Sequence, residues 1–470
     1  MNVAHLFRRR QPAKPHVRPW ALSAPIVVLL ICLPLLRPLR HPDPRLISDD
    51  ELARLATIES LVERRTLSID KSPLAPQRGL ITRGDHVYSD QPPTMAALLA
   101  GPYSVMRRFD LTFANNPALV AYLLTLIGVT IPVAAGTGLI YRMGRMFELP
   151  RQKRAMLAMA VALGSGFVSY GVVLNAQAPA AALVLASVAA IVHVAISRRP
   201  TATSGWLAAA GACAMLAAAI YPPAIVFVVL MAATIIAMRW RARMKLAGLA
   251  LYALGAAGPL LLHGALVKPV TGDLLPPRFH ADLVATTAAD AAAAAEADEM
   301  DDLGPAGAGW WAVLGRNLAR LAAALFGEHG ILSHFPVLIF GILGVAAVMH
   351  RHWPMTTKVL ATATLVGAGA VVVACALVLL IGAGPMFGPQ AFILFLPLTL
   401  FWSGAWLRRR HGAGAWVLAG VLLAFSVAVS LIGATNPCPR DGYDRYTVAQ
   451  ALSNLIRPDA IQPPPTLAGR

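Results

Sequence analysis

Three consecutive acids are the part of the sequence best suited to chemistry. Asp49, Asp50 and Glu51 follow Ser48, a good helix N-cap, and they fall in a first helical turn, where the helix dipole favours negative charge. Apolar residues then recur at helical spacing as far as Leu61. The pattern predicts a short amphipathic helix on a membrane surface. One of its carboxylates can serve as a general base, although a capped surface helix without chemistry explains the same residues.

Metal binding is an alternative role for these acids that the sequence leaves open. Asp49, Asp50, Glu51, His86 and His334 offer oxygen and imidazole ligands for a divalent cation, but their spacing matches no metal motif. Beyond that alternative, the residues imply no cofactor. The sequence also lacks a P-loop, a Gly-x-Ser-x-Gly elbow and a His-Glu-x-x-His pair.

The composition places these acids in a membrane protein. Of 470 residues, 57% are hydrophobic and 13% are charged, whereas soluble domains are about a quarter charged. Lipid must therefore surround most of the chain. The net charge of +17 has no aromatic residues interleaved with it and no nucleic-acid-binding motif, so we expect no nucleic-acid partner.

Long apolar segments define the fold class. A spanning helix needs about 20 mostly apolar residues, and eleven segments of roughly suitable length lack Asp, Glu, Lys and Arg. The sequence therefore predicts an all-α polytopic membrane protein with about eleven transmembrane helices. The predicted spans are 20–36, 117–140, 155–172, 178–196, 205–220, 222–238, 246–267, 331–349, 359–381, 390–406 and 413–434.

Basic residues are concentrated in every second loop. With the N-terminus inside, the inside loops hold 21 of the 40 Lys and Arg residues and Glu148 as their single acid. This distribution fits the positive-inside rule. It predicts a multi-pass membrane protein with a cytoplasmic N-terminus and an outside C-terminus. The high content of Ala, Arg and Gly suggests a GC-rich bacterial genome, so we expect the membrane to be a bacterial inner (plasma) membrane. The inside loops are 1–19, 141–154, 197–204, 239–245, 350–358 and 407–412.

The chain then divides into three parts. Residues 1–19 form a basic cytoplasmic N-terminus, residues 20–434 a transmembrane domain, and residues 435–470 an outer tail. The transmembrane domain has two long outer loops, loop one at 37–116 and loop two at 268–330. Residues 92–108 in loop one are apolar but too short to span, so we expect a second interfacial helix there.

Loop one also carries a family resemblance. The pair Asp50-Glu51 soon after the first span, followed by Tyr88-Ser89-Asp90-Gln91-Pro92-Pro93, resembles the polyprenyl-phosphate-sugar-dependent glycosyltransferases of the C superfamily. Within that superfamily the sequence is most similar to the bacterial aminoarabinose transferase and protein mannosyltransferase-like group. Weaker matches occur at 271–273, 330–336 and 387–390.

The resemblance implies a function. A sugar on a polyprenyl-phosphate carrier would enter from the bilayer and pass to a glycan, lipid or protein acceptor on the outer face of the envelope. Asp50 would act as general base, in the company of Asp49 and Glu51. The leaving group is a lipid phosphate, so cations or hydrogen-bond donors must stabilise it.

Two positions depart from the family pattern. Gln91 stands where the relatives have a Lys that contacts the lipid phosphate, and Gln390 stands where they have an Arg. The candidate replacements for the lost cations are Arg54, Arg83, His86, His329 and His334, and each also fits an ordinary surface or interface residue. The residues we therefore expect to contact the donor are Arg54, Arg83, His86, Tyr88, Gln91, His334 and Gln390.

Two other functions remain alternatives. A transporter or flippase for a lipid or small solute has the same general architecture, but transporters usually place charged residues near the bilayer midplane, and the predicted spans contain none. A non-catalytic assembly protein of the envelope would not need the loop-one acids to converge on a cavity open to lipid.

Overall fold

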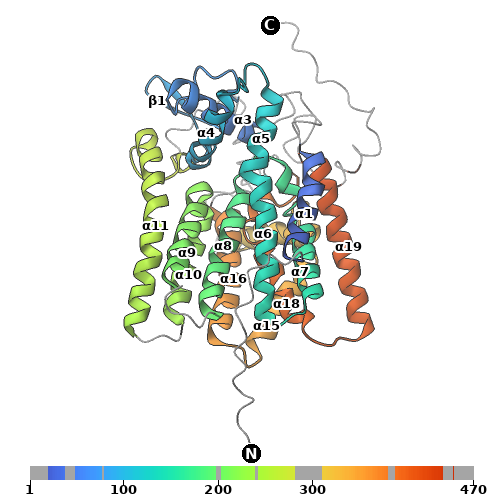
Figure 1. The fold of residues 1–470 in the computed structure, drawn as a ribbon. Coiled ribbons are helices and arrows are strands. Elements are labelled where there is room, and N and C mark those ends of the chain that lie inside the picture. Colours follow the sequence, from blue (N-terminus) through green and yellow to red (C-terminus); the bar gives the residue numbers. More distant parts are fainter. Residues whose placement is uncertain are drawn as a thin grey trace, which may run out of the picture.

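The computed structural model describes residues 20–36, 48–76, 79–196, 203–238, 242–280, 310–378 and 387–437, together with Val448 and Leu452. The predicted cytoplasmic N-terminus, the middle of loop two and almost all of the predicted outer tail lie outside these residues. The described chain is a bundle of roughly parallel helices with a smaller layer of loop-one elements over one end (Figure 1).

Apart from loop one, which lies between η2 and α5, the helices of the first half of the bundle are joined by turns of a few residues. Many of these turns contain Pro or Gly, which end or bend helices because Pro lacks a backbone N–H and Gly has no side-chain restraint. The elements are α1 (Trp20–Cys32) with η2 (Leu33–Leu35), α5 (Pro117–Thr125) with η5 (Leu126–Thr130), α6 (Ile131–Met143) with η6 (Gly144–Phe147), α7 (Arg151–Gly164), η7 (Ser169–Val172), α8 (Gln177–Ile196), α9 (Thr203–Ile220), η9 (Pro222–Ala224), α10 (Ile225–Ala237) and α11 (Ala242–Thr271).

The second half contains more breaks. Its elements are η10 (Pro277–Phe279), α13 (Trp310–Phe326), α14 (Ile331–His334), α15 (Leu338–Met349), α16 (Met355–Val373) with η11 (Ala374–Val378), η12 (Gln390–Phe392), α17 (Leu396–Phe401), α18 (Ser403–Leu407) and α19 (Ala413–Thr435).

Fewer of the described helices are long enough to cross a membrane than the sequence predicts. Five helices in the described part are long and apolar enough to cross a membrane, and a bent pair gives a sixth. Each of the eleven predicted segments does contain helix, but several are short or interrupted. The multi-pass helical membrane fold is thus present, whereas the count of eleven is not confirmed.

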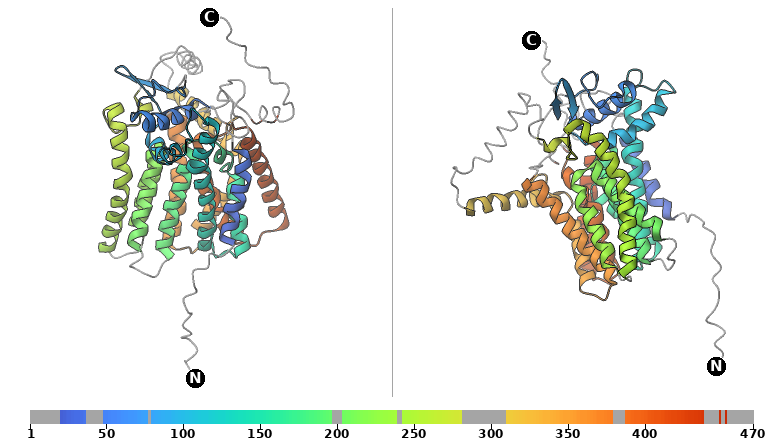
Figure 2. Two further views of the ribbon diagram at one scale, coloured as in Figure 1. Left: turned by 45° about the horizontal axis from the view of Figure 1, so that its top comes forward. Right: turned by 90° about the vertical axis from the view of Figure 1, so that its left-hand side faces the viewer.

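The bent pair joins α13 and α14 to α15. The two parts meet at an angle of 93° next to Pro336, where a helix cannot continue its hydrogen bonding. As a result α13 projects sideways from the bundle (Figure 2).

Loop one forms the layer over the bundle. It contains α3 (Asp49–Glu59), η4 (Ser60–Arg64), the strands β1 (Leu80–Arg83) and β2 (His86–Ser89), and α4 (Thr94–Arg107). The strands form an antiparallel hairpin in which Leu80 pairs with Ser89. The predicted all-α class therefore needs one correction, because this hairpin was not expected.

The predicted environment of the first loop-one helix also needs correction. The sequence predicts that its apolar stripe rests on the membrane surface, but Leu55 and Ile58 are buried in the protein core. Instead, α3 packs against α4 and β2.

Helices α9 and α11 pack closely against each other. A Cβ atom added at Gly211 would stand 1.9 Å from the carbonyl oxygen of Tyr252, and one at Gly255 would stand 1.9 Å from that of Ala208. Only residues without a side chain allow two backbones to approach this closely, as in other membrane helix pairs. Gly211 and Gly255 therefore set the position of α11, whose far end leads to the site.

Loops that are predicted to lie on the same side of the membrane contact one another. At one end of the bundle Arg408 forms an ion pair with Glu148, and Lys153 donates a hydrogen bond to the Leu407 carbonyl. These contacts join two predicted inside loops. At the other end, the loop-one layer contacts the segments that follow α7 and α11, as described next.

Candidate active site

The N-terminus of α3 positions the first acids. The Ser48 hydroxyl accepts a hydrogen bond from the Glu51 backbone N–H at 3.3 Å, which is the N-cap that the sequence predicts. One helical turn further on, the Arg54 guanidinium donates to the Asp50 carbonyl at 3.0 Å. Asp50 and Arg54 therefore lie on the same face of α3.

Gln91 joins this helix to the start of α4. It lies in the turn after β2, where its N–H donates to the Ser89 hydroxyl at 3.0 Å. Its side-chain Nε2 donates to Asp50 Oδ1 and to Asp90 Oδ1, both at 3.0 Å, and its Oε1 accepts from Arg54 at 3.0 Å. One amide thus connects two carboxylates and a guanidinium, and it brings Asp50 and Asp90 within two hydrogen-bond lengths of each other.

The Arg54 guanidinium is an internal brace. The residue is 3% exposed and also donates to the Leu174 carbonyl at 3.3 Å. Burial lowers the pKa of Arg54, and the carboxylate of Asp50 acts in the opposite direction. Because its hydrogen bonds go to fixed partners on three segments, Arg54 stabilises the site rather than facing a ligand.

Glu51 also points into the protein. It is buried, and its Oε1 accepts from the Leu174 backbone N–H at 3.4 Å. The N–H and the carbonyl of Leu174 therefore both bind side chains of α3. This pairing places the segment between α7 and α8 directly beneath the acids.

Asp90 has a cationic partner from loop two. Arg278, in η10, donates to Asp90 Oδ2 at 3.0 Å. Burial raises the pKa of Asp90, Arg278 opposes this rise, and the nearby Asp50 carboxylate adds to it. Burial disfavours the charged form of Arg278 too, but Asp90 and Asp50 outweigh that effect and raise its pKa.

Two pockets flank Gln91. The first, which we call the Tyr88 pocket, is lined by Tyr88, Ser89, Thr57 and Gln91, together with apolar side chains. The second, the Tyr221 pocket, is small and is lined by Gln91, Arg278, Tyr221, Pro222, Pro223 and Phe279. Apolar walls with one cation suit a ligand that has an anionic head and an apolar tail.

Two predicted donor contacts lie elsewhere on loop one. The Arg83 guanidinium donates to the Pro269 carbonyl at the end of α11, at 3.2 Å. The His86 ring contacts the Asp70 carboxylate at 2.8 Å, with 61% of its side chain exposed. The structure therefore does not bring Arg83 or His86 to Asp50.

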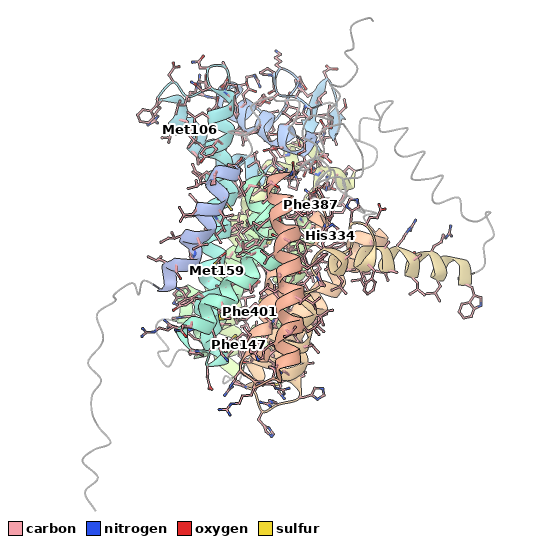
Figure 3. The ribbon with its side chains drawn as sticks, turned by 90° about the vertical axis from the view of Figure 1, so that its right-hand side faces the viewer. Met106, Phe147, Met159, His334, Phe387 and Phe401 are labelled. Carbon is pink, nitrogen blue, oxygen red and sulfur yellow. The ribbon has the colours of Figure 1, made fainter. Side chains whose placement is uncertain are left out.

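Two further predicted contacts lie deeper in the second half of the bundle. His334 Nδ1 donates to the Gly330 carbonyl at 2.9 Å, and its ring packs edge-on against Phe387. Figure 3 shows both side chains near the base of α13, below the loop-one layer. Gln390 is buried in η12, and among the described residues it makes no hydrogen bond to Asp50 or Gln91.

Metal binding gains no geometric support. Among the described residues, no group of three or more His, Cys, Asp or Glu side chains is arranged to hold a metal ion. The expected ligands are dispersed, because His86 pairs with Asp70, His334 lies beside Phe387 and Glu51 contacts Leu174.

Two residues that contact the Asp50–Gln91 pair or its neighbours, Asp90 and Arg278, are not among the site residues that the sequence predicts. Asp90 lies next to Gln91 inside the motif that carries the family resemblance, so its place in the sequence could have identified it as a site residue. Arg278 lies in a Pro-Pro-Arg-Phe stretch of loop two, and nothing local marks it as a partner of a residue 188 positions earlier.

No family model matches the sequence, and no curated protein sequence matches it either. Solved structures do match the fold. An oligosaccharyltransferase from Archaeoglobus fulgidus aligns with a TM-score of 0.51 at 14% identity, over 91% of this chain and 57% of that one. The oligosaccharyltransferase AglB from the same organism, solved with an inhibitory peptide and a dolichol-phosphate, aligns with a TM-score of 0.50 at 12% identity, over 88% and 55%.

A third structure, ArnT from Cupriavidus metallidurans, aligns with a TM-score of 0.49 at 15% identity, over 86% of this chain and 62% of that one. The chain spans little more than half the length of the two oligosaccharyltransferases. At these identities the likeness concerns the fold. The chain shares the membrane fold of these two oligosaccharyltransferases.

Proposed function

We propose that this protein transfers a sugar from a polyprenyl-phosphate carrier to an envelope acceptor on the outer face of the membrane. The observation that carries the proposal is the Asp50–Gln91–Asp90 cluster, which lies beside a pocket with apolar walls and one guanidinium. AglB was solved with a dolichol-phosphate, so a protein of this fold holds a polyprenyl phosphate.

Asp50 is the general base in this proposal. Its Oδ1 is held by Gln91, and among the described residues no cation forms an ion pair with its carboxylate. Asp90, by contrast, is paired with Arg278. A positioned but unpaired carboxylate can accept the proton of an acceptor hydroxyl or amine, an effect worth roughly 10²–10⁴-fold in rate.

Arg278 is the cation that faces the leaving phosphate. Its side chain is 31% exposed and lines the Tyr221 pocket, whereas Arg54 is enclosed. A guanidinium there supplies the charge that a Lys at position 91 gives in the resembling family. Gln91 can then be neutral, because its task is to orient the two carboxylates.

The location follows the charge distribution. We place the loop-one layer outside a bacterial inner membrane and the end that contains Arg408 and Lys153 in the cytoplasm, because positive loops are retained inside. The contacts between loop one and the segments at 174 and 278 support a common side for these loops.

The direct test measures transfer by the purified protein in proteoliposomes that contain polyprenyl-phosphate sugars and envelope acceptors. Asp50→Asn keeps the size of the side chain and removes the base, so we expect transfer to fall at least 10²-fold. Asp85→Asn is the matched control, because Asp85 is exposed in the hairpin turn. Wild-type transfer by Asp50→Asn would remove Asp50 from the proposed role, and solute uptake without any glycosylated product would indicate a transporter.

A further inference from the structure

The Arg278–Asp90 ion pair has two features that suit it to change partners. Arg278 Nη2 lies 3.0 Å from Asp90 Oδ2, and the Arg278 side chain is 31% exposed and lines the Tyr221 pocket. A ligand entering that pocket meets the guanidinium while Asp90 already occupies part of it. Arg54 offers no such opportunity, because it is 3% exposed and its hydrogen bonds go to three separate segments.

Asp90 is held in place independently of Arg278. Its Oδ1 accepts from Gln91 Nε2 at 3.0 Å, and its backbone N–H donates to the Gly79 carbonyl at 2.9 Å. Its carboxylate also lies against the Cα of Gly79, where an added Cβ would come within 3.2 Å of Oδ1. The carboxylate therefore stays beside Asp50 if the guanidinium turns away.

We propose that Arg278 exchanges Asp90 for the phosphate of the polyprenyl carrier, so that donor binding releases the Asp90 carboxylate next to Asp50. This inference rests on the proposed function for the identity of the ligand. Guanidinium groups bind phosphate through two parallel hydrogen bonds. Pro222, Pro223 and Phe279 provide the apolar wall that the first isoprene units need.

The exchange links donor binding to proton acceptance. Once Arg278 binds the phosphate, less positive charge compensates the Asp50 and Asp90 carboxylates, which both accept from the Gln91 amide. Repulsion between the two negative carboxylates then favours the uptake of a proton by the pair. In the transfer step the acceptor oxygen bonds to the anomeric carbon, the bond from that carbon to the phosphate oxygen breaks, and the acceptor proton passes to the carboxylate pair. The leaving phosphate gains negative charge and remains on Arg278.

The test compares two variants whose effects should have opposite signs. The probe is farnesyl phosphate, titrated calorimetrically into the purified full-length protein in lipid nanodiscs. Arg278→Gln should weaken binding about tenfold or more, since hydrogen bonds to charged groups contribute roughly 1.5–3 kcal/mol. Asp90→Asn should tighten binding several-fold, because the competitor for Arg278 is removed while the amide contact to position 91 remains available.

The controls separate charge from folding. Arg108→Gln removes an exposed cation at the end of α4 and should leave binding unchanged. Farnesol has the same tail without the charge, so neither site variant should alter its binding. Arg278→Lys keeps the charge but loses the paired hydrogen bonds, and should give intermediate affinity with an unchanged thermal unfolding midpoint.

Each outcome decides the matter. Unchanged affinity in Arg278→Gln would show that the phosphate binds elsewhere, and weaker or unchanged affinity in Asp90→Asn would show that Asp90 only positions Arg278. Either result overturns the exchange. If both affinities shift as expected but Asp50→Asn retains transfer, the exchange stands and the assigned base is wrong.

Discussion

Replacement of Gln91 by Met tests the centre of the site. Met has nearly the same length and is apolar, so the change removes the hydrogen bonds to Asp50, Asp90 and Arg54 with little change in volume. All three partners are charged, and each such bond contributes roughly 1.5–3 kcal/mol. Because the bonds share one amide, their losses are not additive, and we expect the free energy of unfolding to fall by about 3–5 kcal/mol.

The same change should reduce transfer more than donor binding. Asp50 loses the only hydrogen bond that the described residues give its carboxylate, and a displacement of about 1 Å can cost roughly 10²-fold in rate. The assay is initial-rate transfer in proteoliposomes, accompanied by farnesyl phosphate binding and by thermal unfolding. We expect the fall in turnover to exceed the fall in affinity.

Gln177→Met is the matched control for this experiment. Gln177 is buried at the start of α8, and its Oε1 has no hydrogen-bond partner among the described residues. The same substitution there removes little, so stability and transfer should stay near wild type. If Gln91→Met kept wild-type turnover while Asp50→Asn lost it, the idea that the amide orients Asp50 would be refuted.

Two further predictions concern stability. Gly211→Ala should destabilise the protein and lower its thermal midpoint, because the new methyl group would stand 1.9 Å from the Tyr252 carbonyl oxygen, whereas Gly258→Ala should be tolerated because no atom lies within 4 Å of its added Cβ. The raised pKa of Asp90 predicts that the contribution of Asp90 to stability is greatest below the ordinary aspartate pKa and falls as pH rises through the raised value, since the folded state then loses a proton that it holds more tightly than the unfolded state. Thermal unfolding across pH should show this fall in the wild type and a flatter profile in Asp90→Asn; equal slopes would contradict it.

The sequence predicted those features that depend on local pattern. The Ser48 cap, the helix that follows it and the helix in 92–108 are all present, because capping and apolar spacing act within a few residues. The meeting of Asp50 with Gln91 was expected only through the resemblance, since no local pattern fixes a contact over 41 positions.

The remaining features depend on tertiary contacts. His86 was expected near the donor, but Asp70 attracts its ring on the exposed side of the hairpin. Arg278 was missed because its importance comes from its position opposite Asp90. The count of eleven spans is not confirmed, because breaks such as the one at Pro336 divide apolar runs into pieces that are too short to span alone. Apolar content alone does not distinguish a straight helix from a broken one.

The double contact to Leu174 has a consequence for how proteins of this fold are recognised. Its peptide N–H and carbonyl, not its isobutyl group, tie the acids of α3 to the segment beneath them. Another residue type at that position can offer the same two groups, so substitutions can accumulate there without loosening the tie. Proteins of this fold can keep such backbone supports while their sequences diverge beyond alignment, and a search for shared geometry would find them where a search for shared residues fails.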